Sequence, residues 1–175
     1  MNTFALEIWF DETSLCSFYT VRKDGFEDNE TDLFFKKFED EDNQYNNSAQ
    51  ELLYLIVNSI GDVYGATDDF FDRIENKAQA LPPKPKKWIP EIKELGIHFP
   101  LRLLCFRISE SIVVLFNGGI KDQRTEQESK DLSINFYEAQ EFAKRIVEAL
   151  RDKTILISEN GRILTDFQNN TDIIL

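Results

Sequence analysis

The sequence predicts an α+β protein in which helices pack on a twisted, mainly antiparallel sheet. Pairs of β-rich segments occur near the start, the middle and the end of the chain, and segments with helical periodicity separate them. Strands and helices do not alternate one for one, which argues against a parallel βαβ sheet. The 175 residues are expected to form a single domain, residues 1–175, because this length buries a core without a metal or a disulfide.

The first elements are predicted to be a hairpin. Residues 3–10 and 15–22 are rich in β-branched and aromatic side chains, and a polar stretch separates them. Thr31 is then expected to cap a short helix over residues 31–42. That helix should stop or fray at its acidic end, because negative charge is unfavourable beside the carbonyl end of a helix.

A second helix is predicted to begin at the capping box Ser48–Glu51. Gly61 and Gly65 mark its weakening end. Its inward stripe is expected to consist of Leu52, Leu53, Leu55, Ile56, Ile60 and Val63.

Residues 67–80 are predicted to form a third, weaker helix. Residues 82–100 hold all five prolines of the chain, and proline removes backbone donors and disfavours helix before it. This segment is therefore expected to be a linker.

A further hairpin is predicted from two apolar runs, 101–108 and 112–116, on either side of a polar turn. Gly118 and Gly119 are expected to break its second strand. A helix should follow over residues 134–151, and Asn160-Gly161 predicts a last hairpin over residues 153–167. The C-terminal residues either fray or dock on the domain.

Charge is distributed unevenly along the chain, whose net charge is −12. Residues 1–50 carry a net charge of −8, and residues 84–124 carry a net charge of +4. The net charge of −12 argues against generic nucleic-acid binding, because phosphate contacts need cations. The asymmetry indicates either a basic face on an acidic body or an acidic surface that only maintains solubility.

Several classes of site find little support in the composition. Cys16 and Cys105 both lie in apolar contexts, so two buried thiols in a reducing cytoplasm are expected rather than a disulfide. Two cysteines and one histidine make a zinc site improbable, and no metal or other cofactor is implied. His98 is more readily explained as a structural or exposed residue than as a catalytic base. No signal peptide or membrane span is recognised, which predicts a cytoplasmic protein without a membrane partner.

Cations around the middle hairpin suggest phosphate chemistry, since preorganised positive charge stabilises the transition state of RNA cleavage. The candidate catalytic residues are Arg102, Lys121 and Arg124. Strand alternation places Arg102 and Arg107 on opposite faces, so two ordinary surface arginines are an equally good interpretation. The candidate phosphate-binding and base-stacking residues are Arg107, Lys84, Lys86, Lys87 and Trp88.

The middle hairpin resembles a known family. Its strand LRLLCF, the strand IVVLF and the following Gly119-Ile120-Lys121 are similar to the core of RelE/ParE-superfamily toxins, and of their HigB-like branch in particular. The resemblance places a RelE-like core at about residues 13–152, extended by a C-terminal helix and hairpin. Arg102 matches the strand arginine of the family and Lys121 the first lysine of its closing motif. Asp122 stands where a second lysine is usual.

The resemblance implies a toxin–antitoxin protein that cleaves mRNA on the ribosome without a metal, with a helix-turn-helix antitoxin as partner. Two other functions stay open. One is a non-catalytic protein-interaction module on the same fold. The other is an acidic inhibitor that mimics nucleic acid through residues 24–42. The sequence leaves the oligomeric state undetermined.

Overall fold

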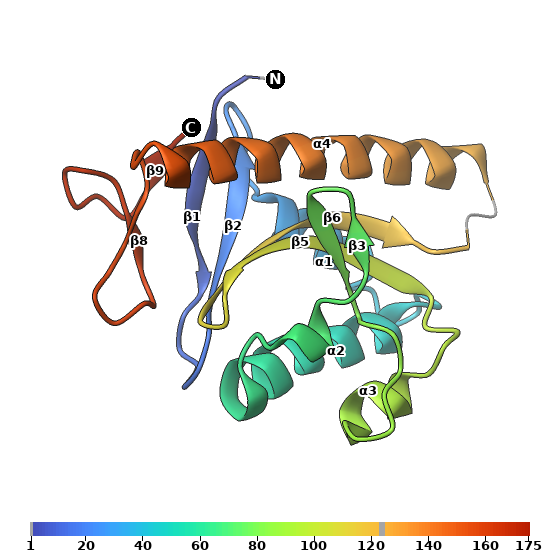
Figure 1. Ribbon diagram of the computed structural model, residues 1–175. Helices are drawn as coiled ribbons and strands as arrows, with labels where there is room; N and C mark the ends of the chain where they lie inside the picture. The colour runs from blue at the N-terminus through green and yellow to red at the C-terminus, as the bar shows by residue number, and fades with distance from the viewer. Residues whose placement is uncertain (1, 123–124) are drawn as a thin grey trace.

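The computed structural model describes residues 2–122 and 125–175, apart from the side chains of Glu75 and Glu126. One seven-stranded sheet runs through these residues in the order β3-β4-β5-β6-β2-β1-β9, beside a small β7–β8 hairpin. The long helix α4 lies across one face of the sheet, and α1, α2 and α3 lie on the other (Figure 1). The predicted α+β class is confirmed.

The N-terminal hairpin consists of β1 (Phe4–Phe10) and β2 (Ser17–Lys23), which pair antiparallel as predicted. On its other side, β2 pairs parallel with β6 over residues 17–20. This parallel pair joins the two hairpins into one sheet and makes the sheet mixed rather than purely antiparallel.

The middle hairpin consists of β5 (Leu101–Ser109) and β6 (Ile112–Ile120). Gly118 and Gly119 do not break β6, as the sequence had suggested, but belong to it and pair with β5. The register shifts between Leu103 and Cys105, and at this irregularity the two backbones come close together. A Cβ at position 118 would lie only 2.0 Å from the Arg102 carbonyl oxygen, so this position requires glycine.

Helix α1 (Glu30–Lys36) stops before the acidic residues, as expected from its unfavourable C-terminal charge. Its cap is Asn29 rather than Thr31, since the Asn29 side chain accepts a hydrogen bond from the Asp32 N–H at 2.8 Å. Thr31 is buried two residues further on, where its hydroxyl meets that of Thr20 at 2.7 Å and donates to the Leu115 carbonyl at 3.0 Å.

Helix α2 (Asn46–Tyr54) begins two residues before the expected capping box, and no side chain caps it. It continues as the π-helix η1 (Leu55–Tyr64). Gly61 lies inside η1 and not at a weakening end, and its backbone packs against Thr13, to which a Cβ at this position would lie 2.7 Å away. That contact and the hydrogen bond from the Leu15 N–H to the Gly61 carbonyl (2.8 Å) tie η1 to the β1–β2 turn.

The predicted third helix over residues 67–80 is wrong. This segment forms the short helical turn η2 (Asp68–Phe70) and two strands, β3 (Ile74–Glu75) and β4 (Ala78–Leu81). The outer edge of β5 recruits β4 as an antiparallel partner, and this tertiary pairing overrides the weak helical pattern. The expected linker also contains a helix, α3 (Pro90–Leu95), with Pro90 at its first position, where proline fits a helix.

Helix α4 (Glu126–Arg151) begins earlier than predicted, at a capping box formed by Thr125 and Glu128. The last hairpin is confirmed as β7 (Leu156–Ile157) and β8 (Leu164–Thr165). The C-terminal residues dock as β9 (Ile173–Ile174), which extends the sheet beside β1.

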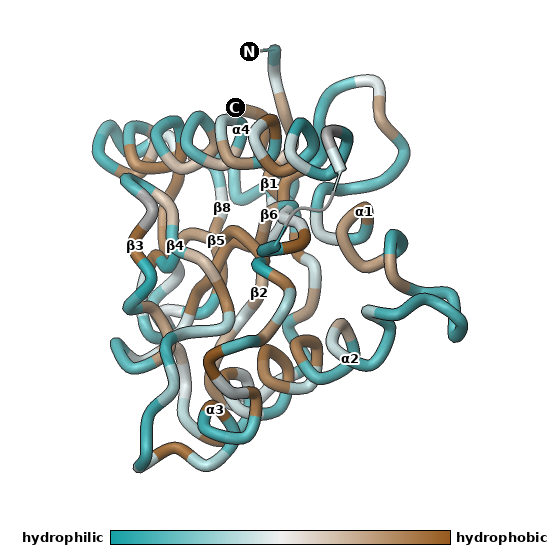
Figure 2. Tube along the Cα trace, turned by 90° about the vertical axis from the view of Figure 1, so that its right-hand side faces the viewer, coloured by the Kyte–Doolittle hydropathy of each residue, from teal (hydrophilic) through white to brown (hydrophobic). Residues whose placement is uncertain are grey.

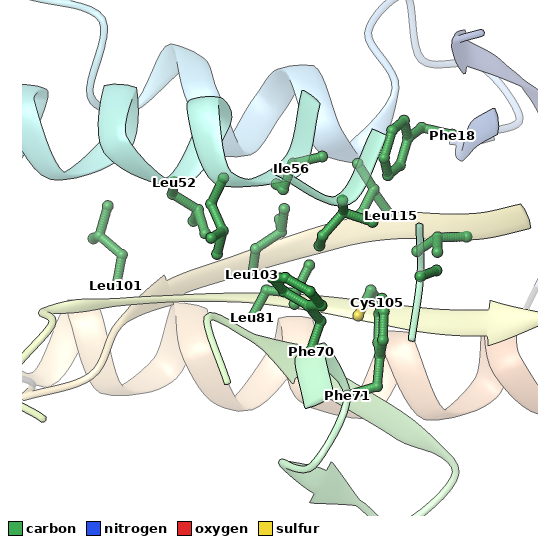
Figure 3. Packing of buried hydrophobic residues seen from close by; sticks show 14 of the residues in the cluster. Phe18, Leu52, Ile56, Phe70, Phe71, Leu81, Leu101, Leu103, Cys105 and Leu115 are labelled. Carbon is green, nitrogen blue, oxygen red and sulfur yellow. The ribbon is translucent and has the colours of Figure 1, made fainter. Parts of the chain in front are cut away.

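Two apolar clusters cover the two faces of the sheet. One lies under α4 and includes Phe4, Phe116 and Phe142. The other lies under α2, η1 and α3, and in Figure 3 Leu52 and Ile56 approach Leu103 and Leu115 of the sheet. Figure 2 shows the hydrophobic residues of the helices concentrated toward this interior. Leu53 and Val63, which the sequence had placed in the inward stripe, are 37% and 53% exposed.

Candidate functional site

Two of the candidate catalytic residues lie at the same end of the middle hairpin. Arg102 is near the start of β5, and its guanidinium donates to the carbonyls of Phe99 (3.0 Å) and Leu101 (2.8 Å). Lys121 follows β6, and its backbone N–H donates to the Pro100 carbonyl at 2.6 Å. The third residue, Arg124, lies outside the described residues.

Arg107 lies near the opposite, turn end of β5. Its guanidinium donates to the Ala66 carbonyl (2.9 Å) and to the Asp68 carboxylate (2.5 Å), and it lies over the Phe71 ring. Its neighbour on the strand, Cys105, packs on the α2 side of the sheet. Arg107 therefore ties η2 to the sheet and does not join Arg102.

The lysine segment of the predicted linker folds around one aspartate. Asp72 accepts hydrogen bonds from the Lys84 backbone N–H (3.1 Å) and from the Lys86 ammonium. The Trp88 indole N–H points to Asp69 at 3.4 Å, and its ring is 70% exposed. Lys87 is exposed. Asp72 offsets the charge of Lys86, so the surface that this segment presents is less basic than its sequence suggests.

A buried polar chain that was not predicted from the sequence lies between α1, β6 and α4. Lys37 Nζ donates to Asn117 Oδ1 (2.8 Å), and Asn117 Nδ2 donates to the Glu30 carboxylate (3.1 Å), which is almost fully buried. Lys23 Nζ then lies 3.5 Å from Glu30 and 3.1 Å from Glu138. This alternation of donors and acceptors satisfies each buried charge.

The same chain explains the pKa shifts of its two lysines. Burial lowers the pKa of Lys37. Burial acts in the same sense on Lys23, but the carboxylates of Glu30 and Glu138 outweigh it and raise the Lys23 pKa. The Gly118 carbonyl accepts from both Lys37 Nζ (3.0 Å) and Asn135 Nδ2 (2.8 Å), so the chain also fixes the end of β6 against α1 and α4. Its role is to hold these elements together.

The outward side of α2 and of the first turn of η1 is lined by several hollows. We call it the α2 face and define it by Gln50, Leu53, Tyr54 and Val57. Tyr54 is 62% exposed and Leu53 is 37% exposed. Three adjoining hollows of about 600, 460 and 230 Å³ meet there, and each has Gln50 in its lining.

Aromatic side chains wall the largest of these hollows. It lies between β1 and the α2–η1 helix, and Trp9 and Phe10 form its β1 side. Trp9 is held in place, because its indole N–H donates to Asp32 at 2.9 Å and its ring stacks on Phe35 with centroids 5.9 Å apart. This wall is therefore preorganised rather than adaptable.

The α2 face is uniformly acidic. The described residues that line its three hollows include no lysine, arginine or histidine. They include five carboxylates, namely Glu39, Glu51, Asp62, Glu91 and Glu94. The surface thus combines exposed aromatic and aliphatic groups with negative charge of one sign.

A further hollow of about 490 Å³ lies on the other side of the sheet, against α4. Phe26, Ile134 and Tyr137 line it, and all three are at least half exposed. Lys23 and Glu138 also line it, and they form an ion pair. This surface is apolar and carries mixed charge.

Comparison of the chain with protein-family models, with curated proteins and with solved structures finds no match. The similarity of the middle hairpin to RelE/ParE toxins therefore stays a prediction. Within residues 2–122 and 125–175, no group of three or more histidine, cysteine or acidic side chains is arranged to hold a metal ion. Over the same residues, no helix combines the length and the apolar character needed to cross a bilayer.

Proposed function

We propose that this protein is a non-catalytic interaction module whose α2 face binds a protein partner with a basic surface. One observation carries the proposal. Its apolar centre consists of the exposed Leu53 and Tyr54 and the half-buried Val57, and the charged residues of the surrounding hollows are all carboxylates.

Both features of this face have a physical consequence for binding. Protein interfaces concentrate their energy in a few aromatic and aliphatic anchors near the centre, and Tyr54 has the exposure of such an anchor. Charges of one sign at the rim speed encounter with a partner of opposite sign and disfavour partners of like sign. A partner with lysines and arginines around an apolar patch fits both requirements.

Two tyrosines of nearly equal exposure provide a matched test. Tyr54 on the α2 face is 62% exposed, and Tyr137 on α4, across the sheet, is 64% exposed. Tagged wild type, Tyr54→Ala and Tyr137→Ala should be used to isolate partners from the native host, and the bound proteins identified by mass spectrometry. Each candidate is then purified and its affinity measured directly.

The proposal expects one basic protein that binds wild type and Tyr137→Ala equally and binds Tyr54→Ala roughly 30-fold more weakly, the loss typical of an interface anchor. Binding should also weaken as salt rises. Equal binding by both variants contradicts the α2 face as the site. A loss confined to Tyr137→Ala assigns the site to the α4 hollow instead. Competition by DNA for the partner would favour the nucleic-acid-mimicking form of the interaction.

RNA cleavage is the second candidate function, and one observation favours it. Arg102 and Lys121 lie at the same end of the hairpin, as a phosphate site would require. Expression in a bacterial host tests it. Growth arrest with cleaved mRNA, abolished by Arg102→Ala with Lys121→Ala, would support a RelE/HigB-like toxin, whereas unaffected growth with intact mRNA would count against it.

A further inference from the structure

A buried hydroxyl marks one hollow of the α2 face as a site. Ser59 lies in η1, is 0% exposed and lines the hollow of about 460 Å³ between α2, η1 and α3. Across residues 2–122 and 125–175, its Oγ is the one buried side-chain polar atom without a hydrogen-bond partner. Most buried hydroxyls in folded proteins are paired, and this one is left able to accept a hydrogen bond from a group that enters the hollow.

The position of Ser59 is unusual for a second reason. It belongs to a ten-residue π-helix, and π-helical turns occur frequently at functional sites. In η1 the residues around it, Leu55, Ile56 and Ile60, are buried against the sheet. The serine hydroxyl is thus a lone polar group set into an otherwise apolar helix surface at the base of the hollow.

The walls of the hollow define the charge of its ligand. Glu51 comes from α2, and Glu91 and Glu94 come from α3. Glu91 is held by the Tyr64 hydroxyl, which donates to its carboxylate at 3.0 Å, and this interaction raises the Tyr64 pKa. The described lining contains no cation, so a positive group entering the hollow meets three carboxylates without a competitor there.

The remaining lining suits an aliphatic stem. Leu55, Leu95 and the Tyr54 ring supply apolar surface, and the side-chain amides of Asn47 and Gln50 complete the wall. A long cationic side chain packs its methylene groups on such surface while its head reaches polar partners. The space is also of the size that small ligand groups occupy in proteins.

We propose that this hollow receives a cationic side chain, lysine or arginine, of the partner that binds the α2 face. Its stem packs on Leu95 and the Tyr54 ring, its head pairs with the carboxylates of α3, and entry of the head opens the floor of the hollow so that one N–H donates to the buried Ser59 Oγ. This inference rests on the proposed function, because it commits the hollow to a protein partner. Free alkyl cations share the chemistry and serve as probes.

The first test needs no partner. Butylammonium and butylguanidinium are titrated into the full chain by NMR, with butanol and butyrate as controls. The amides around Ser59 and Glu94 should shift saturably with the cations and not with the controls. Ser59→Ala should weaken cation binding about tenfold, as expected for a hydrogen bond to a charged group. Glu94→Gln should weaken it as well.

A matched serine provides the control. Ser48 lies in α2, which runs directly into the η1 of Ser59, but it is outside the lining, so Ser48→Ala should leave cation binding unchanged. Cation binding that Ser59→Ala and Glu94→Gln leave intact would be nonspecific attraction to an acidic surface and would overturn the inference. Absence of saturable binding to the folded chain up to tens of millimolar probe would overturn it too.

The second test separates this inference from the proposed function. If the partner still requires Tyr54 but Ser59→Ala leaves its affinity unchanged, the α2 face stands and the side-chain pocket is wrong. If the alkyl cations bind through Ser59 but the partner ignores Tyr54→Ala, the pocket chemistry stands and the docking surface is wrong. Thermal unfolding of each variant checks that it is folded. Ser59→Ala should unfold at the wild-type temperature, because removal of an unpaired hydroxyl should not destabilise the protein.

Discussion

Gly118 gives the sharpest stability prediction, because its substitution brings two backbones into collision. In Gly118→Ala, the new Cβ would lie 2.0 Å from the Arg102 carbonyl oxygen and 2.9 Å from the Leu103 Cα. A carbon and a carbonyl oxygen normally stay about 3.3 Å apart even in close contact. The atoms that must move are backbone, so relief requires β5 and β6 to separate where the Gly118 carbonyl also binds Lys37 and Asn135.

The magnitude follows from these contacts. Overpacking costs about 1–3 kcal/mol, and the loss of one ladder hydrogen bond adds about 1 kcal/mol, so Gly118→Ala should lower the free energy of unfolding by about 2–4 kcal/mol. Gly119→Ala is the matched control. Its Cβ would lie 3.3 Å from the Leu132 Cδ1, the end of a flexible side chain, and the cost should stay within about 1 kcal/mol.

Urea unfolding followed by tryptophan fluorescence measures this difference, provided that both variants keep the wild-type dependence on urea. The expected result is a much lower midpoint, or loss of folded protein, for Gly118→Ala alone. Equal midpoints for the two variants would refute the close approach of β5 to β6, and with it the irregular register of the hairpin.

Three further predictions concern buried groups. Burial raises the pKa of the Cys16 thiol to about 12 and raises that of Cys105 as well, so both thiols should resist alkylation at pH 8 until denaturant is added; rapid labelling of the native protein would contradict their burial. Asn117→Ala removes the link between Lys37 and Glu30 and should destabilise the protein by about 1–3 kcal/mol in urea unfolding, since each of these buried charges loses a hydrogen bond while Lys37 keeps the Gly118 carbonyl and Glu30 keeps Lys23; a cost near zero would show that the chain is not structural. The pKa of Lys37 is lower in the folded protein than in the unfolded chain, so just below pH 10.5 the unfolded chain binds more protons and the wild type gains stability as pH rises. Lys37→Met lacks this gain, so its free energy of unfolding minus that of wild type should fall as pH rises toward 10.5. A constant or rising difference would oppose the direction of the pKa shift.

The elements predicted correctly are those whose signals are local. Both predicted strand pairs before residue 121 combine two apolar runs with a polar turn, and the C-terminal hairpin has Asn160-Gly161 at its turn. The early end of α1 follows from the acidic residues after it. In each case the residues that decide the structure are neighbours in sequence.

The errors lie where distant segments decide. Residues 78–81 are a strand because β5 lies beside them, and the parallel pairing of β2 with β6 joins segments about 95 positions apart in sequence. Asn29 caps α1 instead of Thr31, because the Thr31 hydroxyl is hydrogen-bonded to Thr20 and to the Leu115 carbonyl. Local patterns carry no trace of these contacts.

Contacts between distant segments also limit how much of the site can be predicted from the sequence. The register of the hairpin was enough to bring Arg102 and Lys121 to one end and to separate Arg107 from them. Arg107 and Lys86 pair with Asp68 and Asp72, which lie elsewhere in the chain. From the sequence alone, both cations therefore look more available to a phosphate than they are. One local pattern indicates the α2 face. The helix carries more consecutive apolar residues than a single buried stripe can hold, namely Leu52, Leu53, Leu55 and Ile56.

We propose that the α2 face, and not the cationic end of the hairpin, binds the partner. The most direct measurement is the affinity of the purified partner for Tyr54→Ala and for the double variant Arg102→Ala with Lys121→Ala, side by side with wild type. We predict a loss of roughly 30-fold for Tyr54→Ala and wild-type affinity for the double variant. Unchanged affinity for Tyr54→Ala, with binding lost in the double variant, would instead assign the partner to the cationic end of the hairpin.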